Sequence, residues 1–363
     1  MTSVAKLFTD MSLPDGWKTG AKLPLARLES SGTVANGKLY VFGGFVVGLL
    51  ATSRVDVYDP QSDSWRQLAD MPEPVTHVNA VVEGKNIWFA GGFVGDHPAP
   101  VTRQVWKYDT VADSWSGGIP LPLERGGGAM QLVGRSLHYF GGFASDRDTT
   151  CGDHWVLSLD GGTEWIPRAP LPDAKGHLAS ILLGDKIYAI GGQYRHDTKP
   201  KDVASVHVYD PTQDRWSELA SLPEPRSHFE PGTFVFNDQI IIIGGRNNRK
   251  KRENNPNFWN HKEDRYIDDL PHRVWRKVNH HWNYDYISCA IAVYDPLNDT
   301  WTELSTLPAH LLAPVANAIK NQLIVTGGGK NWVTNPQCRT LLNQTLLDAV
   351  KRPKSHQYSQ TTV

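Results

Sequence analysis

Three histidines occupy the same place in three similar stretches of the sequence. His77, His177 and His228 each follow, by five residues, the proline of a Met-Pro or Leu-Pro pair. Imidazole nitrogens bind transition metals and exchange protons near neutral pH, so three copies aimed at one point would form a metal site or an acid–base site. The alternative is that each histidine hydrogen-bonds to backbone and completes a strand. The choice depends on the elements that carry them.

The elements follow from an internal repeat. A tryptophan stands six positions before each of six Leu-Pro or Met-Pro pairs, and a Gly-Gly doublet follows each proline by 19 residues, or by 21 in the fifth repeat. Between a doublet and the next tryptophan lies an alternating segment such as "VDVYDP", which is typical of a strand that ends in a turn. The tryptophans are Trp17, Trp65, Trp115, Trp165, Trp216 and Trp301. Each repeat therefore predicts four short strands.

A four-stranded unit of about 50 residues cannot bury both of its faces alone, so the repeats must pack around an axis as the blades of an all-β propeller. We expect one six-bladed propeller over residues 1–350, with an inserted loop at 246–287 and a flexible tail at 351–363. The sixth doublet is followed by a third-strand candidate at 338–344 but by no tryptophan strand. The strand at Trp17 is predicted to complete that last blade, which removes a free sheet edge.

The doublets, the Tyr-Asp pairs, the spaced tryptophans and Pro225-Arg226 resemble the Kelch repeat, over roughly residues 15–345. The resemblance implies a six-bladed Kelch β-propeller, a fold that serves both enzymes and protein-interaction modules. In architecture the chain is similar to sialic-acid epimerases, to specifier proteins and to the central domain of galactose oxidase. No cysteine stands at the histidine position, so the Tyr-Cys cofactor of galactose oxidase is not expected.

Equivalent positions of a propeller lie at one height around the axis, so the repeat alignment predicts a ring. Its members, in blade order, are Glu29, His77, Gly127, His177, His228 and Ala313. We expect this ring at the start of the innermost strands, with Glu29 opposite His177, with His77 opposite His228, and with an opening at Gly127 and Ala313. Three imidazoles and a carboxylate suit a divalent Fe, Cu or Zn ion.

The fifth repeat leaves one register open. If it is counted back from its Gly-Gly doublet, Glu230 takes the ring position instead of His228. Either side chain can bind a metal, and Glu230 is also a candidate for proton transfer.

Charged and aromatic residues are expected around the ring at the mouth of the channel. Arginines stand three residues after the proline in several repeats, and the loops after the doublets begin with aromatic or polar residues. The candidates for catalysis besides Glu230 are Arg125 and Arg226, and those for substrate binding are Arg27, Phe45, Phe93, Phe143, Tyr194, Arg195, Arg246 and Trp332. The mixture suits a small organic anion with an apolar part. The alternative for the arginines is hydrogen bonding between blades.

The insertion at 246–287 is rich in aromatic residues, which favours a folded lid over disorder. Asp264, Asp268 and His272 have a spacing similar to that of the iron ligands of specifier proteins. The basic run at 249–252 is diluted by acidic residues, so no nucleic-acid partner is expected.

Together these features predict a metal-dependent enzyme, an oxidoreductase, lyase or isomerase, acting on a small and possibly anionic substrate. The alternative is an interaction module that grips an acidic peptide of a partner protein through Arg27, Arg125, Arg195 and Arg226. With 37 basic and 38 acidic residues, three scattered cysteines and no apolar run of membrane-spanning length, we expect a reduced, cytoplasmic monomer without nucleic-acid or membrane partners.

Overall fold

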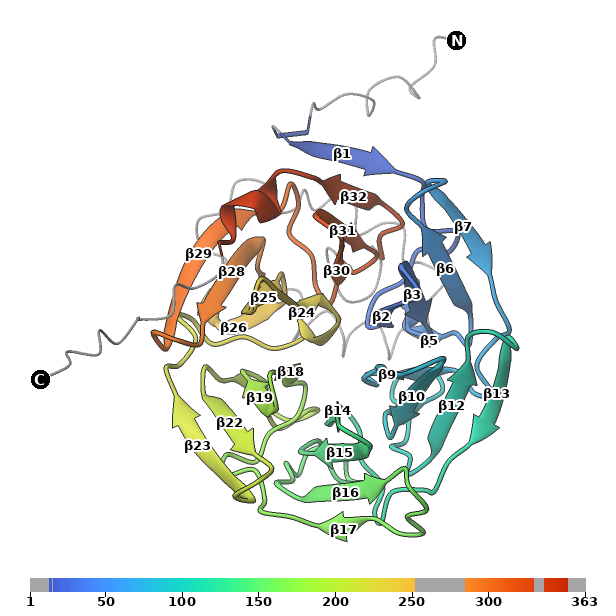
Figure 1. The fold of residues 1–363 in the computed structure, drawn as a ribbon, viewed down its shortest axis with the longest axis vertical. Helices are drawn as coiled ribbons and strands as arrows, with labels where there is room; N and C mark the ends of the chain where they lie inside the picture. The colour runs from blue at the N-terminus through green and yellow to red at the C-terminus, as the bar shows by residue number, and fades with distance from the viewer. Residues whose placement is uncertain (1–12, 15, 252–284, 330–335, 352–363) are drawn as a thin grey trace, which may run out of the picture.

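The computed structural model describes residues 13–14, 16–251, 285–329 and 336–351, and these form a ring of six four-stranded antiparallel sheets (Figure 1). The predicted six-bladed propeller is confirmed. No helix of the described residues is long and apolar enough to cross a membrane.

Each four-stranded sheet is one blade, and in the first five blades the strands follow one another outward from the axis in sequence order. The blades, from first to fifth, are β2 (Ser31–Ala35), β3 (Lys38–Phe42), β6 (Val55–Asp59) and β7 (Ser64–Gln67); β9 (Val81–Glu83), β10 (Asn86–Ala90), β12 (Val105–Asp109) and β13 (Ser114–Gly117); β14 (Ala129–Val133), β15 (Ser136–Phe140), β16 (His154–Ser158) and β17 (Ile166–Pro167); β18 (Ala179–Leu183), β19 (Lys186–Ile190), β22 (Val206–Asp210) and β23 (Arg215–Leu219); β24 (Thr233–Phe236), β25 (Gln239–Ile243), β28 (Ala290–Asp295) and β29 (Thr300–Thr306).

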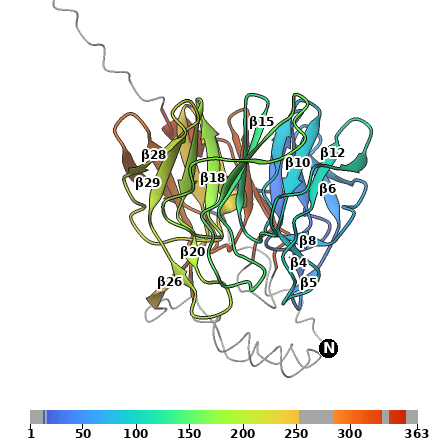
Figure 2. The same cartoon turned by 90° about the horizontal axis from the view of Figure 1, so that it is seen from below.

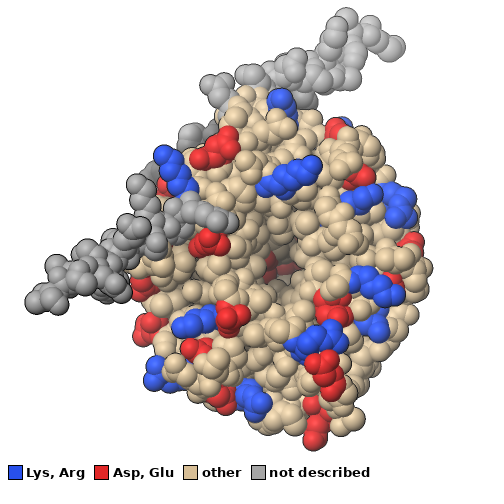
Figure 3. All heavy atoms as spheres, in the orientation of Figure 1, with Lys and Arg blue, Asp and Glu red and all other residues tan. Residues whose placement is uncertain are grey.

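Short two-stranded ribbons extend from one face of the ring (Figure 2). They are β4 (Phe45–Val46) with β5 (Leu50–Ala51), β8 (Val75–Thr76) with β11 (Phe93–Val94), β20 (Gln193–Tyr194) with β21 (Lys201–Asp202), and β26 (Arg246–Lys251) with β27 (Asp285–Ile287). We call this side the ribbon face. The opposite side carries the tight turns of the blades, and we call it the hairpin face. On the hairpin face the molecule is hollowed at the centre of the ring (Figure 3).

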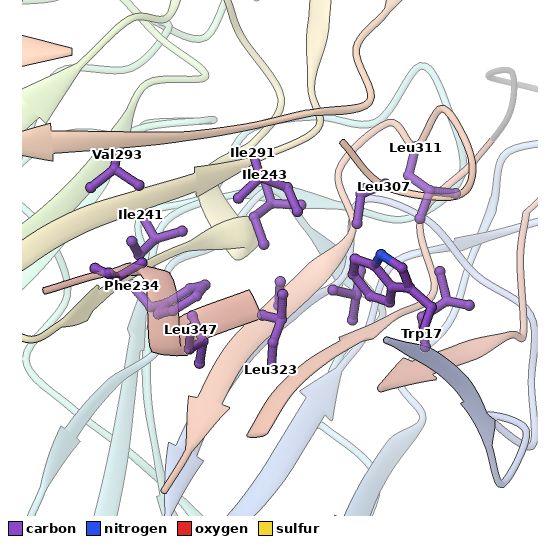
Figure 4. Packing of buried hydrophobic residues seen from close by; sticks show 14 residues of the cluster. Trp17, Phe234, Ile241, Ile243, Ile291, Val293, Leu307, Leu311, Leu323 and Leu347 are labelled. Atoms are coloured by element: carbon purple, nitrogen blue, oxygen red, sulfur yellow. The ribbon is translucent and has the colours of Figure 1, made fainter. Parts of the chain in front are cut away.

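The sixth blade closes the ring with both ends of the chain, as predicted. It consists of β30 (Val315–Ile319), β31 (Gln322–Thr326), β32 (Thr340–Asn343) and β1 (Trp17–Gly20), and the one-turn helix η4 (Leu346–Ala349) follows it. Trp17 opposes Asn343 in the β1–β32 ladder. The indole of Trp17 is buried in one cluster with Leu307, Leu311 and Leu323 (Figure 4), so closure buries apolar surface as well as pairing the edge.

The repeated tryptophan and aspartate residues join neighbouring blades. In the fourth blade the indole Nε1 of Trp216 donates to the carbonyl of Ala169, which follows the outer strand of the third blade, at 2.9 Å. The carboxylate of Asp214 accepts from Ala169 N at 2.9 Å and from the hydroxyl of Tyr209 at 2.7 Å. The same indole bond is made by Trp65, Trp115, Trp165 and Trp301. The regular spacing of these residues is therefore a consequence of blade-to-blade bonding.

The Gly-Gly doublets fix the chain just before the ring position of the next blade. The second glycine donates its N–H to the carbonyl of a residue two positions before the next ring residue, as in Gly142 N to Lys175 O at 2.9 Å and Gly192 N to Arg226 O at 2.8 Å. In the doublet Gly191-Gly192, a Cβ on the first glycine would lie 2.4 Å from the carbonyl oxygen of Arg226. Glycine is therefore required for this close approach.

Candidate functional site

The six ring positions share one backbone conformation. All have positive φ angles: 55° at Glu29, 56° at His77, 61° at Gly127, 45° at His177, 56° at His228 and 44° at Ala313. They lie in the bends that precede the innermost strands. The left-handed conformation is a property of the repeat, and histidine tolerates it better than most residues do. Because Glu29 and Ala313 adopt the same conformation, backbone geometry alone does not explain why three of the six are histidines.

The three histidines converge on the axis. Their imidazole centroids are 4.5 Å apart for His77 and His177, 4.3 Å for His177 and His228, and 6.0 Å for His77 and His228. One donor nitrogen from each of the three lies within 4.8 Å of the other two. The carboxylate of Glu29 joins them, with its Oε2 2.7 Å from Nε2 of His77. We refer to Glu29, His77, His177 and His228 as the histidine cluster.

The expected pairing of Glu29 with the opposite His177 is wrong, and so is the expected opening at Gly127. The carboxylate of Glu29 instead contacts His77 of the adjacent blade. The space beside Gly127 is filled by the ring of His177, since a Cβ on that glycine would lie 2.9 Å from Nδ1 of His177. The absent side chain makes room for an imidazole rather than for a substrate.

His228 and Glu230, the two candidates for the ring position of the fifth repeat, both face the axis. His228 takes the ring position, and the two extra residues of the fifth repeat form part of the short 3-10 helix η2 (Glu230–Gly232). The helix carries the Glu230 carboxylate to 3.8 Å from Nδ1 of His177, on the side of the central cavity that the innermost strands line. Burial, together with the nearby carboxylate of Glu29, raises the pKa of Glu230 to about 8.

His177 has no hydrogen bond at either ring nitrogen from any residue that the structure describes. Its side chain is completely buried. Burial, and then the neighbouring imidazoles of His228 and His77, hold the pKa of His177 well below its ordinary value. A neutral imidazole offers a lone pair on one nitrogen, which is the form that binds a metal ion.

A hydrogen-bonded relay orients His228. The hydroxyl of Ser227 donates to Asp202 Oδ1 at 2.8 Å and lies 2.6 Å from Nδ1 of His228. Because the single hydroxyl proton goes to the carboxylate, Nδ1 of His228 must carry its own proton and donate to Ser227, which makes Nε2 the acceptor nitrogen. Such outer partners fix the tautomer of metal-binding histidines. No sequence motif indicated this relay, because Asp202 lies 25 residues from Ser227.

Arg246, a predicted substrate-binding residue, belongs to the same buried network. Its Nη2 lies 2.7 Å from Asp202 Oδ1, and it also bonds the side-chain oxygen of Gln193. The guanidinium is therefore committed to protein partners beneath the cluster.

Aromatic residues seal the cluster on the ribbon face. Phe45, Phe93 and Phe143 are buried, and the rings of Phe93 and Phe143 lie 6.2 Å and 5.1 Å from that of His177. As predicted, these residues adjoin the ring, but they are packed beneath it and are not displayed in an open mouth. His196, to which the sequence assigned no role, adds another ring at 5.0 Å from His177. Burial lowers the pKa of His196 to about 4.

The other predicted cationic residues are buried within the blades. Arg27 is fully buried, 2.9 Å from Asp56, and Arg125 pairs with Asp153 while lying over the ring of Trp155. Arg226 is 8% exposed. These positions favour the structural alternative for the arginines, because none of the three side chains reaches an open surface.

The remaining predicted residues lie at the periphery or outside the described chain. Tyr194 donates to Asp173, and Arg195 is exposed on the ribbon face. Trp332 and the residues Asp264, Asp268 and His272 lie outside the described residues, as does most of the insertion predicted at 246–287. The ends of that insertion pair with each other as β26 and β27.

Comparisons with known proteins agree with the fold. The Kelch motif family matches residues 26–72 and 176–223. The Kelch repeat-containing protein At3g27220 of Arabidopsis thaliana is 26% identical over 260 residues, which are 67% of this chain and 61% of the relative. The Kelch-like protein terF of Aspergillus terreus is 25% identical over 63% of this chain and 52% of its own length. Beta-scruin of Limulus polyphemus is 26% identical over 47% of this chain and 15% of its own length.

A solved structure shares the architecture. The structure of YjhT superposes with a TM-score of 0.67 over 88% of this chain and 95% of its own, at 17% sequence identity, a likeness that concerns the fold. The curated relatives named above extend beyond the matched region, which spans 61% of the first of them and less of the others. The chain thus carries matches to the Kelch motif at residues 26–72 and 176–223, resembles Kelch-repeat relatives, and folds as a six-bladed β-propeller.

Proposed function

We propose that this chain is a metal-dependent enzyme that acts on a small molecule at the centre of the propeller. A divalent ion would be bound by His77, His177 and His228, with Glu29 as the fourth ligand. The observation that carries the proposal is His177, a completely buried imidazole without a hydrogen-bond partner among the described residues, set between two further imidazoles. An unsatisfied buried polar group costs about 1–3 kcal/mol, and a bound ion would remove that cost.

The donor set suits a transition metal that accepts nitrogen and oxygen ligands. Metal–nitrogen bonds of about 2.1 Å place two ligands of one ion at most about 4.2 Å apart, so small side-chain rotations would close the observed spacing. Four protein ligands leave room in a five- or six-coordinate ion for a substrate oxygen, which the ion would polarise as a Lewis acid. Glu230 lies beside His177 and is positioned to exchange a proton with a molecule bound there.

The alternative function, binding of an acidic peptide of a partner protein, loses its main support at this site. Arg27, Arg125 and Arg226, which would grip an acidic peptide of a partner protein, are all buried, and only Arg195 of the four is exposed. The geometry of the described residues therefore favours the metal site at the axis over an acidic-peptide site.

The test is elemental analysis of the purified protein, combined with thermal unfolding before and after treatment with a chelator. About one equivalent of metal and a chelator-sensitive rise in melting temperature are expected. His177→Gln should abolish both effects, whereas His207→Gln, a change of a histidine on β22 outside the cluster, should leave them intact. Absence of bound metal, and of stabilisation by added Zn²⁺, Cu²⁺ or Fe²⁺, would overturn the proposal.

A further inference from the structure

The two sides of the histidine cluster differ sharply in the space they leave. On the ribbon face, Phe45, Leu49, His97 and His196 surround a cavity of about 20 Å³, enough for about one water molecule. On the other side, a cavity of about 550 Å³ is lined by residues of all six innermost strands. Cavities of that size accommodate small organic ligands.

Bonds between neighbouring loops close the ribbon face over the second, third and fourth blades. The guanidinium of Arg147 lies 4.7 Å from the centre of the Phe93 ring and bonds Asp197 at 2.9 Å. Asp148 accepts from the backbone N–H groups of His196 and Thr198 at 3.1 Å and 2.9 Å. A ligand arriving from this side of these blades would have to break these contacts.

The large cavity runs from the cluster toward the hairpin face. It is lined by Glu230 beside the cluster, and by Val34, Gly134 and Leu182 near the far ends of the innermost strands. The hollow at the centre of the hairpin face opens in the same direction, and acidic atoms are visible within it (Figure 3).

The wall of this cavity has an unusual charge composition. Among the described residues that line it, Glu230 is the one charged residue, and no lysine, arginine or histidine is present. Hydroxyl and amide side chains alternate with aliphatic ones; the polar members are Ser31, Thr33, Asn79, Gln131, Ser180, Thr233 and Asn317. An anion would meet no compensating cation among the described residues of this wall, so it would bear the full desolvation cost. Hydroxyl and amide groups both donate and accept hydrogen bonds, as uncharged oxygen-bearing molecules require.

We infer that the central cavity is the route to the histidine cluster from the hairpin face, and that it selects an uncharged small molecule bearing hydroxyl or carbonyl groups. This inference rests on the proposed function for the role of the cluster, and it replaces the anionic substrate that the sequence predicted with a neutral one. Two of the arginines that suggested an anion, Arg27 and Arg125, are paired with carboxylates away from this cavity.

The test measures how readily reagents of different charge reach the cavity, and it does not require a bound metal. Thr33, on β2 in the cavity wall, is changed to cysteine in a full-length protein whose Cys151, Cys289 and Cys338 are replaced by serine, and Ser62→Cys on an exposed turn serves as the reference. Labelling rates are measured with neutral, anionic and cationic methanethiosulfonates of similar size.

The rates at the cavity thiol are divided by those at the reference thiol. After this normalisation, the neutral reagent should label the Thr33→Cys protein at least tenfold faster than the anionic one. Equal normalised rates for neutral and anionic reagents would overturn the charge selectivity. No labelling of the Thr33→Cys protein would overturn the route.

A second measurement separates this inference from the proposed function. Modifying the cavity thiol of the Thr33→Cys protein with a bulky neutral methanethiosulfonate leaves a disulfide-linked alkylthio group on the cysteine and releases methanesulfinate. This modification should slow Zn²⁺ loading at least tenfold while leaving the final stoichiometry unchanged. Unchanged loading would contradict the route and leave the metal site standing. If the unlabelled Thr33→Cys protein binds no metal, the proposed function fails, whereas the labelling rates still decide the charge selectivity.

Discussion

The imidazole of His177 occupies the space that a side chain on Gly127 would need. A Cβ atom on Gly127 would lie 2.9 Å from Nδ1 and 3.0 Å from Cε1 of His177. The two residues hold equivalent positions in adjacent blades, so the smallest ring residue gives room to a completely buried one. The cluster thus depends on the ring position that lacks a side chain as well as on those that carry histidine.

Gly127→Ala is therefore expected to displace His177. We predict a loss of roughly 1–3 kcal/mol of unfolding free energy from the contact, in addition to the cost of a left-handed alanine, and weaker metal binding. Gly134→Ala is the matched control, because its φ of 57° is close to the 61° of Gly127 and nothing lies within 4 Å of the added Cβ. Chemical denaturation and metal titration of both variants check this. Equal effects of the two substitutions would show that His177 does not depend on Gly127.

Removing the hydroxyl of Ser227 is expected to loosen His228 without unfolding the blade. Because Ser227 links Asp202 to His228, Ser227→Ala should weaken metal affinity by about 10–100-fold. Ser205→Ala removes a comparable serine–aspartate hydrogen bond, to Asp173, outside the cluster and should leave metal affinity unchanged. Isothermal titration with Zn²⁺ distinguishes the two. The same affinity in Ser227→Ala as in the unmodified chain would exclude the relay from metal binding.

The buried pair His138 and His154 should make the fold sensitive to acid. Nδ1 of His138 lies 3.0 Å from Nε2 of His154, whose own Nδ1 bonds the carbonyl of Ala169 at 3.1 Å. Burial lowers the pKa of His138 to about 3, helped by the adjacent His154, and burial lowers the pKa of His154 to about 4. Free histidine in the unfolded chain binds its proton near pH 6.5.

Unfolding therefore takes up protons between about pH 6.5 and pH 3–4. The stabilising contribution of the pair is complete above pH 6.5 and is lost as the pH falls through this window, by about 1.4 kcal/mol for each tenfold difference in proton affinity. His138→Gln keeps a neutral hydrogen-bond donor and removes one titrating group, so the unfolding free energy should fall less steeply with acid. Denaturation curves measured at several pH values check this, and an unchanged slope would contradict it.

Asp214 should contribute more to blade packing than an ordinary surface residue. Its carboxylate accepts from Tyr209 and from Ala169 of the preceding blade, and its φ is 44°. Asp214→Ala loses both bonds and should destabilise the protein by about 2–3 kcal/mol. Asp214→Asn retains an acceptor oxygen and tolerates the left-handed conformation, so it should cost under about 1 kcal/mol. Similar unfolding free energies for the two variants would refute the blade-joining role.

The fold was predictable because the bonds that define it recur at fixed spacings. Trp216, Asp214 and the doublet at Gly191 each act within one repeat and its neighbour, so the sequence repeats them visibly. Even the addition of β1 to the last blade followed from counting tryptophan strands.

The composition of the histidine cluster could be predicted, but its contacts could not. Alignment identified Glu29, His77, His177 and His228, whereas pairing with a neighbour or with the opposite blade depends on side-chain length and rotamer. The burial of Arg27 depends on Asp56, a residue of a different strand that no motif links to it. The hydrogen bond from Ser227 to Asp202 could not be predicted from the sequence for the same reason.

The most direct test of the central claim is anomalous diffraction from crystals of the protein saturated with Zn²⁺. We predict one anomalous peak on the propeller axis, about 2.0–2.2 Å from a nitrogen of each of His77, His177 and His228 and from an oxygen of Glu29. Saturated crystals without a peak between these residues, or with the ion bound only elsewhere, would contradict the assignment of the histidine cluster as a metal site.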